Sequence, residues 1–189
     1  MSTTVSTTKF TPVDPPFIGN LFTRPIYAWL WLVVRLYLGY NWIESGWGKL
    51  TNPAWMQTGA ALKGFWTNAV AIPAAPGRPL IAFDWYRSFL QGLLDSGSYT
   101  WFAKLIAFSE IIIGVMLILG IYTGLAALLG GFMNWNFIMA GSASINGVFL
   151  VLSILLVLAW KVAGLIGLDR WILTQVGTPW QKGLLFQKK

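Results

Sequence analysis

An apolar run from Trp101 to Gly141 constrains the fold of this chain more than any other feature. A helix needs about 20 mostly apolar residues to cross a membrane, because the hydrocarbon core is about 30 Å thick and each residue rises about 1.5 Å. The run is long enough for two crossings. Its middle holds the segment GIYTG, Gly120 to Gly124, whose glycines interrupt a helix. The sequence therefore predicts a helical hairpin within a membrane.

Two more apolar segments, one on each side of this hairpin, are of similar length. Hydrophobic residues make up 56% of the chain and charged residues only 10%, which is too apolar for a soluble domain of this size. We therefore expect an all-α fold, an integral membrane four-helix transmembrane bundle. The predicted spans are residues 26–47, 100–121, 124–141 and 147–168.

Segments outside the spans predict the domain organisation and the orientation. Residues 1–25 form a polar N-terminal arm, residues 26–170 the membrane domain, and residues 171–189 a juxtamembrane C-terminal tail. Both end segments carry basic residues, and basic residues near spans favour the cytoplasmic side, whereas long loops count for less. We expect a multi-pass protein of the cell membrane with its N-terminus and C-terminus in the cytoplasm.

The long loop between the first two spans predicts two amphipathic helices. The first has Asn52 as N-cap and Pro53 as its first residue. Apolar residues then recur at helical spacing, in the sets Leu62, Phe65, Trp66, Ala69, Val70 and Tyr86, Phe89, Leu90, Leu93, Leu94. Such helices lie at the membrane interface. They form either a structural lid on the bundle or the roof of a pocket where a quinone or lipid-like molecule would enter.

The residue types that the chain lacks exclude several kinds of chemistry. It has no Cys and no His, so it forms no disulfide and binds no metal or haem through Cys or His. Its net charge is +7, but the basic residues lie at span ends and in loops. That placement suits the lipid bilayer and small anions, and we expect no nucleic-acid partner.

Ionisable residues at membrane depth are the first candidates for function, since an unpaired charge there costs about 2.5 to 3.5 kcal/mol. Arg35 and Glu110 fall at the midpoints of two consecutive antiparallel spans, and we predict that they form an ion pair. The pair has either a direct role or the role of fixing helix register. Helical spacing places a packed face around it, formed by Arg35, Gly39, Trp42, Gly46 and Lys49 in the first span and by Glu110 and Gly114 in the second.

Glu44 lies on another face of the first span and has no assured partner, although Lys104 is within reach in sequence terms. The candidate catalytic residues are Glu44, Glu110 and Arg35, and the candidate substrate-binding residues are Lys49, Arg78, Arg87 and Asn136. In the third span, we expect the Asn134 amide to hydrogen-bond inside the bundle. Asn136 points elsewhere, towards a cavity or a partner.

Four segments together resemble the DoxX and DoxD group of small membrane proteins. They are RLYLGYNWIESGWGKL, EIIIGVMLILGIYTG, FMNWNFIMAGSASIN and LAWKVAGLIGLDRW. The last two are also similar to the DoxD-like branch. The resemblance extends from Arg35 to Arg170 and implies a four-helix transmembrane bundle.

The resemblance also implies a function. DoxD-type proteins are membrane subunits of thiosulfate:quinone oxidoreductase, which oxidises thiosulfate to tetrathionate and passes electrons to membrane quinone. We expect a subunit of this type, with quinone as cofactor, thiosulfate as the small anion, and other membrane subunits or a second copy as partners. The alternative is a non-catalytic membrane subunit or accessory protein of a larger respiratory, photosynthetic or oxidative-stress complex. A cavity lined by Glu44, Lys49 and loop aromatics favours the first function, and a filled bundle favours the second.

Overall fold

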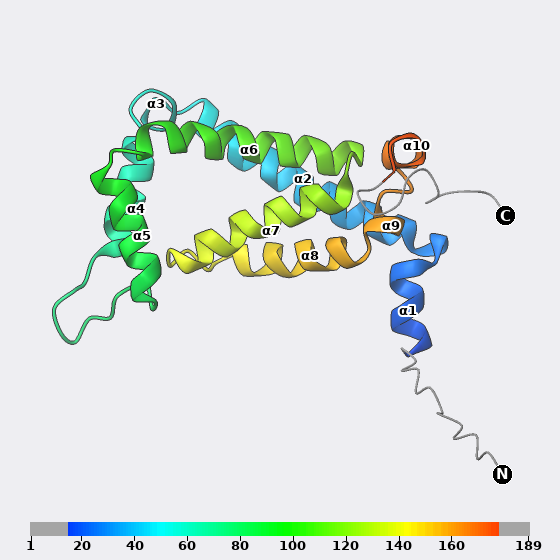
Figure 1. Cartoon of the computed structure of the whole chain (residues 1–189), viewed down its shortest axis with the longest axis horizontal. Helices are drawn as coiled ribbons and strands as arrows, with labels where there is room; N and C mark the ends of the chain where they lie inside the picture. The colour runs from blue at the N-terminus through cyan, green and yellow to red at the C-terminus, as the bar shows by residue number, and fades with distance from the viewer. Residues whose placement is uncertain (1–14, 178–189) are drawn as a thin grey trace, which may run out of the picture.

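The computed structural model describes residues 15–177, which are mostly helical and contain no strand. Four helices run alongside one another in an elongated bundle, with two helices across one end and shorter helices at the other (Figure 1). The elements are α1 (Pro16–Thr23), η1 (Pro25–Tyr27), α2 (Ala28–Leu50), α3 (Pro53–Met56), α4 (Ala60–Val70), α5 (Asp84–Asp95), α6 (Tyr99–Leu119), α7 (Thr123–Met139), α8 (Asn146–Leu158), α9 (Trp160–Ala163) and α10 (Asp169–Gln175). The predicted all-α class is confirmed. The first part of the arm and most of the tail lie outside the described residues.

Helices α2, α6, α7 and α8 form the bundle and start close to the predicted spans. By length and composition, α6 is the one helix among the described residues that is apolar enough to cross a membrane alone. The segments Phe17–Thr23 and Pro25–Leu50 pass the same test only as a pair, bent by 71°. The structure therefore establishes one membrane-capable helix, and the four-span arrangement stays a prediction.

The fourth predicted span, 147–168, is wrong as a continuous helix. Helix α8 ends at Leu158, α9 adds one short turn, and the chain from 164 to 168 is not helical. This segment is instead bound to the α6–α7 turn, because Leu168 N–H donates to Leu119 O at 3.0 Å and Asp169 N–H donates to Gly120 O at 2.7 Å. The apolar composition of the segment reflects this packing and not helical structure.

Glycines bring α2 and α6 into backbone contact. A Cβ atom at Gly114 would lie 2.6 Å from Ile43 Cγ1 and 2.7 Å from the Gly39 carbonyl oxygen. A Cβ atom at Gly46 would lie 3.0 Å from the Ala107 carbonyl oxygen. The predicted packed face is confirmed: Arg35, Gly39, Trp42, Gly46, Glu110 and Gly114 are buried, and Lys49 at its end is half-buried. We call this contact the glycine seam.

The predicted ion pair between Arg35 and Glu110 is wrong. The glycine seam sets Arg35 beside Ile118, whereas Glu110 lies further along α2, level with Lys49. Arg35 and Glu110 are therefore separated by roughly two to three turns of helix, or more than about 10 Å. The prediction assumed that the midpoints of the two spans coincide, and the glycine contacts shift the register away from that alignment. Glu110 pairs instead with Lys49, at 2.7 Å.

Arg35 binds backbone carbonyls where α6, α9 and the following loop meet. Its guanidinium donates to Ala163 O at 2.8 Å and to Ile166 O at 2.9 Å. It lies against Gly120 and Gly167, where a Cβ atom would collide with it. Arg35 therefore has a structural role in holding the segment after α9 against the bundle.

The predicted break at GIYTG is confirmed, because α6 ends at Leu119 and α7 starts at Thr123. Asp169 holds this turn: its carboxylate accepts from Tyr122 N–H at 2.6 Å and from Thr123 N–H at 2.8 Å. A carboxylate at the first turn of a helix satisfies free N–H groups and interacts favourably with the helix dipole. Sequence reasoning did not identify this role.

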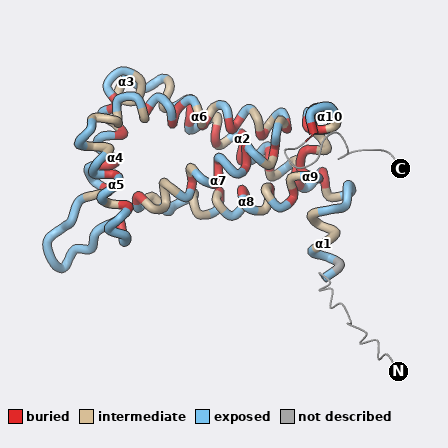
Figure 2. The backbone as a smooth tube through the Cα atoms, in the orientation of Figure 1, coloured by how far each residue is buried: buried red, intermediate tan, exposed pale blue. Residues whose placement is uncertain are grey.

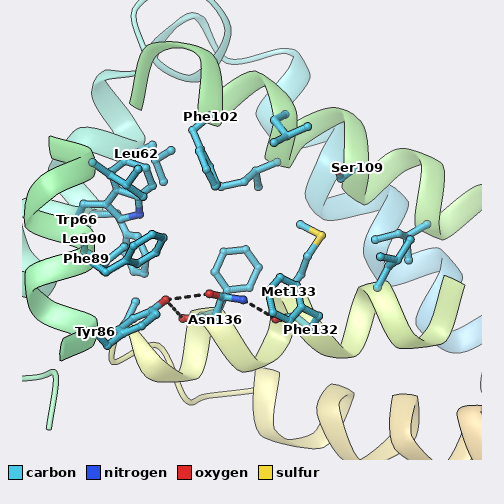
Figure 3. Close-up of a pocket in the computed structure, with 18 of the residues that line it drawn as sticks. Leu62, Trp66, Tyr86, Phe89, Leu90, Phe102, Ser109, Phe132, Met133 and Asn136 are labelled. Carbon is cyan, nitrogen blue, oxygen red and sulfur yellow. Dashed lines mark hydrogen bonds between the residues drawn. The ribbon is translucent and has the colours of Figure 1, made fainter. Parts of the chain in front are cut away.

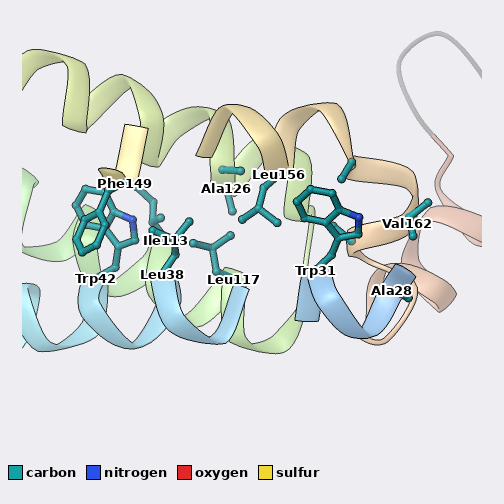
Figure 4. Close-up of a cluster of buried hydrophobic side chains, with 13 residues drawn as sticks. Ala28, Trp31, Leu38, Trp42, Ile113, Leu117, Ala126, Phe149, Leu156 and Val162 are labelled. Atoms are coloured by element: carbon teal, nitrogen blue, oxygen red, sulfur yellow. The ribbon is translucent and has the colours of Figure 1, made fainter. Parts of the chain in front are cut away.

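Buried and exposed residues alternate along the helices of the bundle (Figure 2), and many of the exposed residues are apolar. The main core contains Trp31, Leu38, Trp42, Leu117 and Leu156 (Figure 4). Large apolar side chains are exposed on the outside of the same helices, among them Trp29, Val33, Phe108, Leu128, Val151 and Ile154. A helix bundle that is apolar both inside and outside fits a lipid environment.

We predict that Gly114→Val destabilises the protein by roughly 1 to 3 kcal/mol, because its side chain overpacks the glycine seam. The measurement is thermal unfolding in detergent. Gly48→Ala is the matched control: Gly48 lies in α2 with nothing within 4 Å of a Cβ atom. It should leave stability unchanged or raise it by up to about 1 kcal/mol. Equal melting temperatures for Gly114→Val and wild type would contradict the seam.

Double-mutant cycles test the revised pairing. Arg35→Met and Glu110→Gln should have additive effects within about 0.5 kcal/mol, because the two residues are not in contact. Lys49→Met and Glu110→Gln should be coupled by about 1 kcal/mol or more. Thermal unfolding of the single and double variants gives both coupling energies. Coupling in the first cycle and additivity in the second would restore the original pairing.

Candidate functional site

Helices α4 and α5 form a lid across one end of the bundle (Figure 1). The chain enters the lid region at Asn52, whose side chain accepts from Ala54 N–H at 2.9 Å as predicted. The predicted apolar faces are also confirmed: their buried members are Leu62, Trp66, Ala69, Tyr86 and Leu90. These residues pack together with the start of α6 and the end of α7. The lid is therefore part of a second hydrophobic core.

Beneath the lid is a cavity of about 390 Å³, which we call the apolar cavity. It lies between α6 and α7, and Figure 3 shows lid residues facing it from one side. Its lining includes Trp66, Leu90, Phe102, Ile106 and Met133. The lining residues Leu105, Ile112, Leu129 and Phe132 are also exposed on the outer surface. The cavity therefore opens sideways between α6 and α7, and the lid helices do roof a pocket.

Tyr86 and Asn136 form a polar contact in the wall of the apolar cavity. The Tyr86 hydroxyl donates to the Asn136 backbone oxygen at 3.0 Å and approaches its Oδ1 at 3.2 Å. The Asn136 amide donates to Phe132 O at 2.8 Å. Burial raises the pKa of Tyr86 to about 12, so the phenol keeps its proton at neutral pH. The expectation that Asn136 faces a cavity is confirmed.

A second cavity, of about 490 Å³, lies among α2, α6, α7 and the start of α8. We call it the polar cavity. Its polar lining consists of Asn41, Glu44, Ser45, Lys49, Glu110, Asn134, Ser142 and Asn146, and its aromatic lining includes Trp55 of α3. Phe65 and Phe137 line both cavities. The two cavities are therefore neighbours, separated by two aromatic side chains.

Lys49 and Glu110 form a buried ion pair in the wall of the polar cavity. Lys49 Nζ lies 2.7 and 2.9 Å from the two Glu110 oxygens and also 2.7 Å from Ser45 Oγ. The Glu110 side chain is 1% exposed and the Lys49 side chain 16%. Lys49 Nζ also lies over the Trp55 ring, 5.2 Å from its centroid. The positive charge of Lys49 is thus matched by Glu110.

Glu44 lines the same cavity from the exposed side of α2. Within residues 15–177 it forms no ion pair, and Lys104, its suggested partner, is exposed on α6 without one. Two of the candidate catalytic residues, Glu44 and Glu110, therefore share one cavity. The third, Arg35, lies at the far end of the bundle.

The prediction that Asn134 hydrogen-bonds inside the bundle is wrong. Its side chain is 0% exposed, yet both amide atoms lack a partner among the described residues. Trp42 Nε1 is also buried and unpaired there. Both side chains line the polar cavity. Sequence analysis placed Trp42 on the packed face but did not identify its N–H as a functional group, because spacing alone does not show which buried donors are satisfied.

The remaining candidates, Arg78 and Arg87, line neither cavity. Arg78 is exposed in the loop between α4 and α5. Arg87 donates to Asp84 Oδ1 at 2.5 Å and to Ile81 O at 2.6 Å, so it is bound within its own segment. The structure does not join these arginines with Lys49 in one basic pocket. Nor do the residues from 15 to 177 bring together three acidic side chains that could hold a metal.

Comparison with known proteins gives one match. The model of the DoxX family matches residues 30–143, from α2 through the lid to the end of α7. No curated protein matches, and no solved structure matches. The matched range covers more than half of the chain and carries most of the lining of both cavities. The chain therefore belongs to the DoxX family of membrane proteins.

Proposed function

We propose that this protein is a multi-pass membrane subunit of a quinone-linked oxidoreductase of the DoxD type. In this proposal α2, α6, α7 and α8 cross the membrane, with both termini in the cytoplasm and the lid on the opposite side. The exposed apolar side chains along these helices support the arrangement. Bilayer thinning or partner subunits would accommodate the short α8, which has 13 residues.

The observation that carries the proposal is the pair of adjoining cavities. A membrane quinone has an apolar tail and a ring with two carbonyl groups. The apolar cavity is lined by aliphatic and aromatic side chains and opens between α6 and α7, which suits the tail. The polar cavity next to it is lined by amides, an indole N–H and the Lys49–Glu110 pair, which suit the ring. Ligand sites of this kind combine apolar walls with a few polar groups that orient the ligand.

The electron donor in this proposal is thiosulfate. Joining two thiosulfate ions through a new S–S bond gives tetrathionate and releases two electrons, and a quinone takes up two electrons and two protons to become a quinol. Glu44 and Glu110 are suited to proton transfer to the ring, since carboxyl groups act as general acids. The chain has no Cys or His, so it offers no thiol or His-ligated metal to relay single electrons, and a partner subunit would bind the anion and deliver the electrons.

A non-catalytic accessory subunit is the second candidate function. The observation that favours it is that the described part of the chain joins none of the candidate basic residues into one pocket, since Lys49 is neutralised by Glu110 and Arg87 is bound to Asp84. In that case the cavities hold a lipid or quinone that is not reduced, and the exposed apolar faces of α7 and α8 contact a larger complex.

The proposal predicts thiosulfate-dependent quinone reduction by the protein purified with its partners in lipid nanodiscs. Ser109→Phe, which fills the apolar cavity, should lower kcat/KM for decylubiquinone by about tenfold or more, because the tail loses its space. Val115→Phe is the matched control on α6, since Val115 is exposed and lines neither cavity. Quinol formation is followed by absorbance. If well-folded, quinone-replete protein shows no turnover with or without its partners, the enzymatic function is excluded and the accessory function is the remaining candidate.

Glu44→Gln tests the proton-transfer role separately. Removing the free carboxyl group of the polar cavity should lower kcat by about tenfold or more while leaving KM for decylubiquinone nearly unchanged. Asp95→Gln is the control: Asp95 is an exposed carboxylate at the end of α5 and lines neither cavity. Equal kcat values for Glu44→Gln and wild type would exclude Glu44 from the reaction.

A further inference from the structure

The polar cavity is bordered by buried polar groups that find no hydrogen-bond partner among residues 15–177. Several side chains between residues 15 and 177 have an unpaired buried nitrogen or oxygen, and of these Trp42 and Asn134 line the polar cavity, whereas the others line neither of the two cavities. Leaving such a group unpaired costs about 1 to 3 kcal/mol. Native proteins therefore keep few of them, and those that line a cavity call for a ligand.

These groups lie buried at the contact between α2 and α7, on the border of the polar cavity. Trp42 comes from α2, and its Nε1 faces α7 at Gly130, where a Cβ atom would lie 3.1 Å away. Asn134 is four residues after Gly130 and therefore on the same face of α7. A larger residue at Gly130 would displace the indole. The indole N–H of α2 and the amide of α7 thus lie next to each other in the wall of the polar cavity.

We propose that Trp42 and Asn134 bind the ring oxygen of a neutral, carbonyl-bearing head group whose tail occupies the apolar cavity. This inference rests on the proposed function and assigns the head-group site within it. The indole N–H and the amide NH₂ donate to a carbonyl oxygen. The amide Oδ1 accepts from the hydroxyl that replaces this carbonyl after reduction. Asn134 therefore satisfies both the oxidised and the reduced ring.

The charges of the polar cavity select a neutral head group over an anion. Both oxygens of Glu110 are within 3 Å of Lys49 Nζ, so the ammonium is already paired. Glu44 adds a second carboxylate to the lining. Two carboxylates and one ammonium disfavour thiosulfate or a phosphate headgroup in this space.

The position of the tail follows from the shared lining. Phe65 of the lid and Phe137 of α7 contact both cavities. A ligand with its ring beside Asn134 therefore extends past these two aromatic rings into the apolar cavity. There it meets apolar side chains and the opening between α6 and α7.

Three probes separate the two parts of the site: decylubiquinone, the tail-less quinone ubiquinone-0, and decylbenzene, which keeps the tail but carries a benzene ring without oxygen atoms. Their binding to the full chain is measured by isothermal titration in detergent micelles, with protein-free micelles as the blank. Asn134→Leu and Trp42→Phe should each weaken both quinones by about fivefold to tenfold, the effect of one lost hydrogen bond. Decylbenzene should bind as to wild type. Ser109→Phe should weaken the two tail-bearing probes and leave ubiquinone-0 unchanged.

Stability distinguishes a binding role from a structural one. Asn134→Leu removes two unpaired polar atoms from a buried position, so its melting temperature without ligand should equal or exceed that of wild type. Controls are Asn68→Leu and Trp29→Phe, which change exposed residues that line neither cavity. They should bind all three probes like wild type.

The outcomes separate this inference from the proposed function. If wild type binds decylubiquinone and both Asn134→Leu and Trp42→Phe bind it equally well, the head-group assignment is wrong while quinone binding stands. If wild type binds neither quinone, the proposed function fails and this inference fails with it. Displacement of ubiquinone-0 by thiosulfate, lost in Asn134→Leu, would overturn the preference for a neutral ligand.

Discussion

The glycine seam between α2 and α6 determines where Arg35, Lys49 and Glu110 lie relative to one another. At Gly39, Gly46 and Gly114 the two helices approach so closely that a side chain on either would meet the other backbone. Close contact of this kind tolerates one register only, because side chains adjoin the glycines on both sides. That register sets Glu110 beside Lys49 and Arg35 beside the α6–α7 turn. The ion pair between Lys49 and Glu110 follows from the seam, since a buried charge is costly without its partner.

The two ends of the bundle serve different purposes. At one end, Arg35 donates to backbone carbonyls of α9 and of the loop that follows it. At the same end, Asp169 accepts from backbone N–H groups of the α6–α7 turn. At the other end, the lid packs on diverging helices, and the cavities between them hold the unpaired groups of Trp42 and Asn134. Proteins accept such local losses of stability at functional sites and compensate for them elsewhere.

Sequence patterns predicted features that depend on nearby residues. The break at GIYTG, the Asn52 cap, the apolar faces of the lid and the packed face of α2 each follow from local spacing. The partner of Glu110 was not predicted, because span midpoints say nothing about helix register, and the glycines that fix the register act through contacts between helices.

The end of α8 at Leu158 was missed for a related reason. Apolar residues 159–168 pack against Arg35 and the α6–α7 turn, and hydropathy does not distinguish a buried loop from a helix. For Asn134, helical spacing predicted burial correctly, but the presence of a hydrogen-bond partner depends on four helices at once.

The charge balance of the polar cavity bears on how the proposed reaction is divided. A quinone ring is neutral and can enter a space that holds two carboxylates and one ammonium, whereas a sulfur dianion would be repelled from it. The remaining cationic candidates do not line that cavity: Arg78 lies in the loop between α4 and α5, and Arg87 lies in α5. If both substrates met in one cavity, their opposite requirements for local charge would conflict. The proposed reaction avoids this conflict if the sites are separate, with the quinone within the bundle and the anion outside it, on a surface completed by a second subunit.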